Sequence, residues 1–355
     1  MTAPRLEVRL DDIRNNAAAL VGRLARHGIA VTGITKATLG CPEVAAELLA
    51  AGVVGLGESR IENIEALRRA GITAPITLVR APMLSQVDRV VAHADTSLNT
   101  EVSVLDALSA AAGRQDRRHG VVLMVELGDL REGILSTDLE AVARHALALP
   151  HVVLRGIGTN LACQSGVTPD DRNMAELSDL AVSLEISLGV QLDVISGGNS
   201  ANLDWALGDP KVGRINELRL GEAVLLGCEP LRRRPIEGLR TDAFTLVAEV
   251  IEAQVKPTLA WGAIGETAFG AATPGADRGH TTRVIVALGR QDVEPDGLAL
   301  PDGWRLLGAS SDHLVLDAGT DQPAVGSEVR FGLRYDALLR AMTSPFVART
   351  LLGGT

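Results

Sequence analysis

One lysine stands where amine chemistry is possible, at the carboxyl end of a short apolar run. The segment is VTGITKAT, and it contains Lys36. An apolar environment disfavours the charged form of a lysine and leaves a neutral amine that can form an imine with a carbonyl compound. A solvated lysine at a strand end is the structural alternative, and this segment alone does not decide between the two.

A second candidate segment, SGGNS, follows another apolar run and has the composition of an anion-binding turn. Its residues are Ser196, Gly197, Gly198, Asn199 and Ser200. Paired glycines can expose several backbone N–H groups, and the serine adds a hydroxyl, so the turn could bind a phosphate group. It is no Walker A loop, because no Gly-Lys-Ser/Thr triplet follows. A tight turn between a strand and a helix is the alternative.

Two arginines also fall where a ligand could meet them. Arg219 lies in the run INELRL shortly before Gly221, and a charge at the end of such a strand would need an anion or an acceptor if it is buried. Arg131 lies in the glycine-bounded segment LGDLREGI, where a bidentate clamp on a carboxylate is possible. The alternatives are an ion pair of Arg219 with Glu217 or Glu222, and a surface charge cluster around Arg131.

The elements that must position these side chains are short strands that alternate with helices. Between residues 6 and 228, eight β-branched runs alternate with amphipathic segments rich in Ala, Leu, Glu and Arg. This alternation is typical of βα units with a parallel sheet. Eight units predict an α/β fold of the (β/α)8 TIM-barrel type, whose chemistry lies at the carboxyl ends of the strands. The four segments above fall at those ends.

A change of rhythm after Cys228 indicates a second domain. The residues that follow carry β-rich segments separated by Gly, Pro and Asp, and only RYDALLRAM predicts a helix. We therefore expect residues 6–228 to form the barrel and residues 229–355 to form a mainly β C-terminal domain, which residues 1–5 could join.

Composition limits the partners and the compartment. The formal net charge is -10, whereas proteins that bind nucleic acid carry clustered Lys and Arg. The three cysteines are widely spaced and form no CxxC pair, which argues against a disulfide framework or a zinc site. There is no apolar signal region and no long apolar run. We expect a cytoplasmic protein with no metal, no nucleic-acid partner and no membrane segment.

Ten motifs occur in the order typical of one enzyme family. They are TKAT, GESRIEN, VRAPM, LGDLREGI, GTNLAC, SGGNS, LRLGEAVLLG, ALGRQDV, LGASSDHLVLD and RYDALLRAMTSPFV. Through them nearly the whole chain resembles the alanine-racemase-like (fold type III) pyridoxal-phosphate enzymes, most closely the ornithine racemase branch. The resemblance implies a racemase for ornithine or another long or basic amino acid, which removes the α-proton and returns it. It also implies a homodimer with shared active sites.

The resemblance implies a role for each matching residue. Lys36 would hold pyridoxal 5'-phosphate as a Schiff base and act as the base on one face. Arg219 would meet the pyridine nitrogen, and Arg131 would lie by the substrate carboxylate. The other expected cofactor contacts are Asn160, Ser196, Gly197, Gly198, Asn199, Ser200, Gly221 and Tyr335. A permanently charged arginine disfavours protonation of the ring and restrains the carbanion to simple reprotonation, which suits racemisation.

The chain departs from the alanine racemase pattern at the second catalytic base. Asn160 aligns with the ring-stacking histidine, and no tyrosine occurs in residues 229–334 to act as the opposite-face acid. Asp312 and His313, in the segment ASSDH, are the nearest titratable candidates for this catalytic role. A structural role for both is the alternative.

For each of the other activities known on this fold, the sequence lacks an expected feature. A diamino-acid decarboxylase would carry a cysteine loop in its C-terminal half, and Cys228 lies too early for it. A non-catalytic pyridoxal-phosphate carrier shares a turn such as Gly57-Glu58-Ser59 but consists of the barrel alone. A metal-assisted aldolase or dehydratase would need a His/Cys pair near the C-terminus, where His313 has no such companion.

Overall fold

The computed structural model describes residues 3–271 and 276–354, and these fall into two compact units. Residues 11–241 form one unit, and residues 3–10 combine with residues 242–353 in the other. The boundary expected at residue 228 lies in the loop that follows the last barrel helix.

Eight parallel strands close into a barrel, which confirms the predicted (β/α)8 fold. The first barrel strand pairs with both the second and the last, so the sheet has no free edge. The strands are β2 (Ala30–Ile34), β3 (Gly55–Glu58), β4 (Ile76–Leu78), β5 (Thr96–Asn99), β6 (His119–Met124), β7 (Val152–Gly158), β8 (Val194–Ser196) and β9 (Glu217–Leu220). Their carboxyl ends meet at one rim, which we call the barrel mouth.

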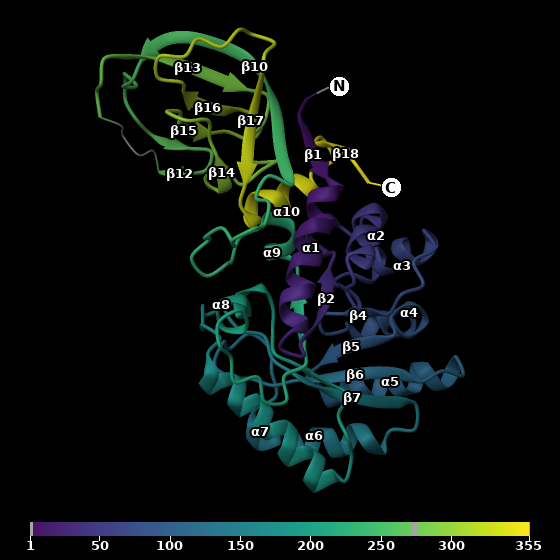
Figure 1. Cartoon of the computed structure of the whole chain (residues 1–355). Helices are drawn as coiled ribbons and strands as arrows, with labels where there is room; N and C mark the ends of the chain where they lie inside the picture. The colour runs from purple at the N-terminus through teal and green to yellow at the C-terminus, as the bar shows by residue number, and fades with distance from the viewer. Residues whose placement is uncertain (1–2, 272–275, 355) are drawn as a thin grey trace. The chain divides into compact units, whose positions relative to one another are not determined.

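Helices follow the strands and lie around the outside of the barrel, as α2 to α7 show in Figure 1. They are α1 (Leu10–Ala25), α2 (Pro42–Ala50), α3 (Ile61–Arg69), α4 (Val87–His93), α5 (Val102–Arg114), α6 (Ser136–Ala148), α7 (Asp171–Leu188), α8 (Leu203–Ala206) and α9 (Glu222–Leu226). The residues Ile61, Ile64 and Leu67 show the helical spacing that buries one face of α3. None of the helices in the described ranges is long and apolar enough to cross a membrane.

Aliphatic side chains fill the barrel, as expected for a chain with so few aromatic residues. Leu98, Val122 and Met124 form a buried cluster, against which Val79 and Val194 pack. These residues come from β5, β6, β8 and the position directly after β4, so the cluster joins several parts of the barrel. Burial of each large aliphatic side chain contributes about 1.5–3 kcal/mol to stability.

The second unit is a mainly antiparallel sheet built on the long strand β10 (Phe244–Pro257), the green arrow in Figure 1. The sheet order is β14-β17-β10-β13-β16-β15; β1 also pairs with β10, and β18 pairs with β1. The remaining elements are β1 (Arg5–Arg9), β11 (Glu266–Thr267), β12 (Gly270–Ala271), β13 (His280–Val286), β14 (Leu298–Ala299), β15 (Arg305–Ala309), β16 (Leu314–Asp317), β17 (Glu328–Leu333), α10 (Tyr335–Thr343) and β18 (Ala348–Leu352).

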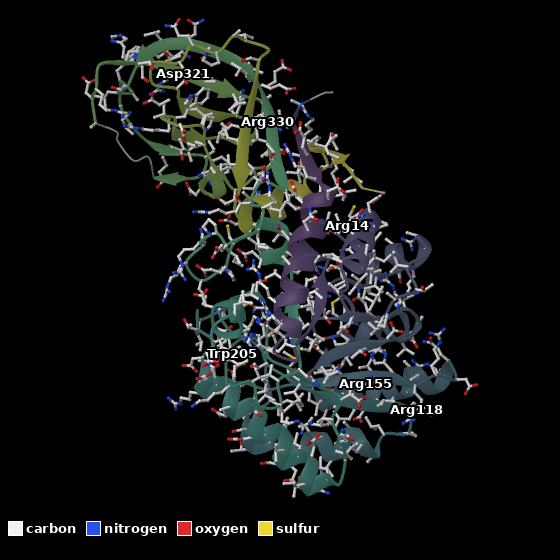
Figure 2. The ribbon with its side chains drawn as sticks, viewed as in Figure 1. Arg14, Arg118, Arg155, Trp205, Asp321 and Arg330 are labelled. Atoms are coloured by element: carbon white, nitrogen blue, oxygen red, sulfur yellow. The ribbon has the colours of Figure 1, made fainter. Side chains whose placement is uncertain are left out.

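A partly buried ionic network holds β1 in this sheet. Arg330 on β17, labelled in Figure 2, donates to the Glu7 carboxylate on β1. Arg5 donates to Glu7 at 3.0 Å and to Glu328 at 2.8 Å. The hydrogen bond from Arg330 keeps the pKa of Glu7 below its ordinary value, although burial works to raise it. The network therefore connects β1 to β17.

Candidate active site

Lys36 lies at the barrel mouth, two residues after β2 ends. It opens a one-turn 3-10 helix, Lys36–Thr38, and its side chain is half-buried. The turn is tight, because Leu39 and Gly40 adopt left-handed backbone angles with φ of 54° and 63°. A Cβ atom at Gly40 would lie 2.9 Å from the Cβ of Asn63. The sequence thus folds locally into a turn that places the lysine at the strand end where it was predicted.

A buried carboxylate anchors the residue before this lysine. Glu58, at the end of β3, is fully buried, and it accepts a hydrogen bond of 3.0 Å from the Thr35 hydroxyl. Its other oxygen accepts from the backbone N–H groups of Ser59 at 2.6 Å and Arg60 at 3.2 Å. Burial raises the pKa of Glu58, while these hydrogen bonds act to lower it. Glu58 therefore connects β3 to the turn that carries Lys36.

The SGGNS turn begins where β8 ends. Gly198 has φ of 143°, and a Cβ atom there would lie 2.2 Å from Asn202 Oδ1. The space is taken because Asn202 Oδ1 accepts the backbone N–H of Asn199 at 3.0 Å, while Asn199 Oδ1 accepts that of Ala201 at 2.7 Å. This reciprocal cap starts the short helix Ser200–Asn202. Only glycine therefore suits position 198.

Ser200 connects the turn to the next loop of the barrel mouth. Its side chain is buried, and its hydroxyl oxygen accepts backbone N–H groups from Gly221 at 3.3 Å and Ala223 at 3.2 Å. The hydroxyl proton remains available to donate to another group. Backbone N–H groups, a hydroxyl and two glycines thus converge after β8 and β9, an arrangement suited to an anion.

The short helix after this turn is itself braced. Trp205 on α8, labelled in Figure 2, donates its indole N–H to Asp171 Oδ1 at the start of α7, at 2.8 Å. This hydrogen bond joins α8 to α7.

Arg219 lies on β9 and is almost completely buried. Its guanidinium donates to the Ser196 hydroxyl and, at 2.7 Å, to the Thr159 carbonyl oxygen. Burial lowers its pKa, and the charge of Glu217 acts in the opposite direction. A buried guanidinium with neutral hydrogen-bond partners can also donate to a ligand atom that accepts.

Arg131 lies in the loop between β6 and α6. The loop is closed at its base, where Glu126 donates its backbone N–H to Ile134 at 3.0 Å and Ile134 donates to Met124 at 2.8 Å. The Arg131 side chain is exposed and pairs with the neighbouring Glu132. The pair is partly exposed, and such ion pairs contribute little to stability, so the guanidinium can exchange Glu132 for another carboxylate.

Asn160, which follows β7, contacts the glycine-rich turn. Asn199 donates its side-chain amide to Asn160 Oδ1 at 3.0 Å and to the Leu161 carbonyl at 2.9 Å. The Nδ2 atom of Asn160 is buried and has no hydrogen-bond partner within the described residues. Buried donors of this kind are rare in folded proteins. The barrel mouth thus contains an unused donor beside a turn that is suited to an anion.

The other predicted residues belong to the second unit. Tyr335 opens α10, and Asp312 and His313 form an exposed turn between β15 and β16. His313 Nδ1 lies 2.9 Å from Asp312 Oδ1. Hydrogen bonds from Ser311 and then His313 lower the pKa of Asp312, so its ionised form is favoured. Their catalytic and cofactor roles stay predictions.

Two acidic residues at the barrel mouth were not predicted as site residues. They are Glu58 and Asp129, both buried. Each is an acidic residue beside a glycine, Glu58 at the end of a strand in GLGE and Asp129 shortly after a strand in LGD. That pattern is the signal by which they could have been found.

Comparison with known proteins identifies the family. A model of the alanine racemase N-terminal domain matches residues 8–230. The chain belongs to this family. Among curated members, lysine racemase of Thermotoga maritima is 39% identical over 98% of this chain and 98% of its own, and ornithine racemase of Acetoanaerobium sticklandii is 34% identical over 98% and 99%. The predicted enzyme class, amino-acid racemase, is therefore confirmed.

Solved structures agree with the family assignment at the level of the fold. Alanine racemase from Streptomyces lavendulae superposes with a TM-score of 0.77 at 24% identity, covering 100% of this chain and 99% of that one. D-threonine aldolase from Filomicrobium marinum superposes with a TM-score of 0.75 at 15% identity, covering 98% and 91%. Because the same fold occurs in a racemase and an aldolase, the fold alone does not decide the reaction.

Proposed function

We propose that this racemase uses pyridoxal 5'-phosphate and acts on basic amino acids such as lysine and ornithine. The full-length relatives with those substrates support the choice of substrate. The observation that carries the cofactor proposal is the barrel mouth itself, which gathers a half-buried lysine, a buried arginine, and a glycine-rich turn beside the unpaired Asn160 amide.

These residues fit the cofactor in charge and in hydrogen-bonding capacity. The ε-amino group of Lys36 would hold its aldehyde carbon, and Ser200, the backbone around Gly198 and Tyr335 would hold its phosphate. Arg219 would face the ring nitrogen and Asn160 the ring. When bound, pyridoxal phosphate stabilises negative charge at the substrate α-carbon.

Arg219 would limit the reaction to racemisation. A guanidinium only donates hydrogen bonds and stays charged in proteins, so Arg219 would pair with an unprotonated ring nitrogen and disfavour protonation there. The ring would then withdraw electrons less strongly, which would suit simple return of the proton to the α-carbon. Ser196 and the Thr159 carbonyl hold the guanidinium in a fixed orientation for this role.

Two residues on opposite faces of the substrate would move the proton. Lys36 would take or give it on one face, and Arg131 would hold the substrate carboxylate meanwhile. We assign the other face to the Asp312–His313 turn, supplied in a homodimer by the β domain of a second subunit. His313 is the better donor, because hydrogen bonds from Ser311 and His313 lower the pKa of Asp312 and favour its carboxylate, which can only accept.

A chiral assay tests this function directly. The purified protein, supplied with pyridoxal phosphate, is incubated separately with L-lysine, L-ornithine and L-alanine, and the products are separated by chiral chromatography. We expect D-lysine or D-ornithine to form faster than D-alanine. Preferential conversion of alanine would contradict the substrate proposal, and release of carbon dioxide with a diamine would indicate a decarboxylase instead.

A further inference from the structure

We propose that Asp129 is a positioning residue that locks two loops of the barrel mouth together and so holds Arg131 in place for the substrate carboxylate. The role of Arg131 in this inference rests on the proposed function. The lock itself consists of contacts within the barrel unit.

The lock joins loops that are distant in the sequence. Asp129 is 2% exposed, and its two carboxylate oxygens accept the backbone N–H groups of Gln164 at 2.9 Å and Ser165 at 3.0 Å. The Ser165 hydroxyl donates to the Asp129 carbonyl oxygen at 2.7 Å. Three hydrogen bonds therefore connect the loop after β6, which carries Arg131, to the loop after β7, which follows Asn160.

The carboxylate form of Asp129 is the form that the lock requires. Burial acts to raise its pKa, but the backbone N–H groups of Gln164, Ser165 and Val167 outweigh burial, and the pKa lies below the ordinary value. The charge of Arg131 acts in the same direction. Hydrogen bonds to an ionised acceptor are stronger than those between neutral groups.

A residue in each of the two loops has a left-handed backbone conformation close to the lock. Leu130, next to Asp129, has φ of 55°, and Ala162, two residues before Gln164, has φ of 68°. Residues other than glycine keep a left-handed conformation only where the surroundings impose it. Asp129 lies next to Leu130 in one loop and bonds Gln164 in the other, so it is placed to impose the left-handed conformation in both loops.

Other contacts of the Arg131 loop do not replace the lock. Glu126 Oε1 accepts the backbone N–H groups of Gly128 at 2.5 Å and Leu130 at 3.1 Å, so it acts within its own loop. Arg131 pairs with Glu132 in its own loop, and its side chain also bonds Cys163, a side-chain contact that leaves the backbone of the second loop to Asp129. Asp129 is the buried residue of this set whose carboxylate bonds the backbone of the second loop.

The variants Asp129→Ala and Asp129→Asn test the inference. The first removes all carboxylate bonds, and the second retains one acceptor oxygen, which keeps the test usable if the alanine variant folds poorly. Hydrogen exchange is followed by mass spectrometry in the peptide covering residues 126–134, with no cofactor added. Steady-state kinetics then give KM and kcat for the preferred amino acid.

Asp170→Ala is the matched control. The Asp170 carboxylate also accepts two backbone N–H groups, from Arg172 and Asn173, both at 2.9 Å, but it caps α7 and lies outside the Arg131 loop. We expect this variant to lower stability without a change in KM or in exchange of residues 126–134.

For Asp129→Ala we expect exchange in residues 126–134 and KM each to rise about tenfold, with kcat changed much less, because loss of bonds to a buried charge has roughly that effect on an equilibrium. The asparagine variant should be intermediate. Parent-like exchange and KM in both variants would overturn the inference, as would the same rise in KM from Asp170→Ala. If the parent protein racemises no amino acid, the proposed function fails. Hydrogen exchange in residues 126–134 of the Asp129 variants still shows whether Asp129 locks the two loops.

Discussion

Asn199 donates its side-chain amide to Asn160 Oδ1 at 3.0 Å, although the two residues lie 39 positions apart in the chain. The bond fixes the orientation of the Asn160 amide, and its Nδ2 atom is left buried without a partner in the described structure. An unsatisfied buried donor costs about 1–3 kcal/mol. This cost suggests a site that a ligand completes, and it leads to the first prediction.

Asn160→Ala should weaken the binding of pyridoxal phosphate about tenfold, because the ligand loses a donor that was buried and ready to bond. Titration of the cofactor-free protein, followed by visible absorbance, gives the dissociation constant. Asn173→Ala, which removes a capping amide from α7, is the control and should bind as the parent does. Equal affinities for the Asn160 variant and the parent would exclude this contact.

Lys36→Ala should give a colourless protein and reduce racemisation by about 10³-fold or more, since it removes both the cofactor attachment and a general base. The chain contains two other lysines, Lys211 and Lys256, and alanine variants of these provide controls that should stay yellow. Borohydride reduction followed by peptide mapping should place the cofactor on Lys36. A label on either control lysine would contradict the assignment.

Gly198→Ala should destabilise the SGGNS turn and weaken cofactor binding, because its Cβ would lie 2.2 Å from Asn202 Oδ1 at φ of 143°. We expect a loss of about 1–3 kcal/mol in the free energy of unfolding. Gly208→Ala is the control, since its Cβ would make only ordinary contacts at 3.4 Å. Urea unfolding of both variants measures the difference, and similar midpoints would refute the prediction.

His119 should make the protein sensitive to acid. It is 1% exposed, and burial lowers its pKa from 6.5 to about 4. Between these values the unfolded chain binds the proton and the folded chain does not, so stability falls as pH drops from 6.5 to 4. The loss amounts to about 3 kcal/mol.

Urea unfolding at pH 7.5, 5.5 and 4.5 measures this dependence. His119→Gln should reduce the fall in stability, whereas the exposed His280→Gln should leave it unchanged. An unaltered pH profile for the His119 variant would mean that other groups cause the acid sensitivity.

His313→Ala should remove α-proton exchange with solvent deuterium for one enantiomer and preserve it for the other through Lys36. Asp312→Ala should have a smaller effect, because the low pKa of Asp312 disfavours its acid form. NMR of the recovered amino acid measures the exchange. If both variants exchange both enantiomers at the parent rate, the second base lies outside this turn.

Much of the architecture could be predicted because its signals are local. The alternation of apolar runs with amphipathic segments predicts β2 to β9, and strand direction then places Lys36, Gly198 and Arg219 at one rim. A turn such as SGGNS depends on residues within a few positions of each other, as the reciprocal cap of Asn199 and Asn202 shows. Residue type and order determine these features.

Closure of the barrel decided the contacts that hold the site. Thr35 bonds Glu58, 23 positions later in the chain, and Asp129 accepts a bond from Gln164, 35 positions later. These contacts form because neighbouring strands bring the loops that follow them together. The sequence by itself determined the barrel, the family and the residues at the strand ends. Only the tertiary structure decided which oxygen meets which N–H group, because such pairing depends on distances between loops that no local pattern encodes.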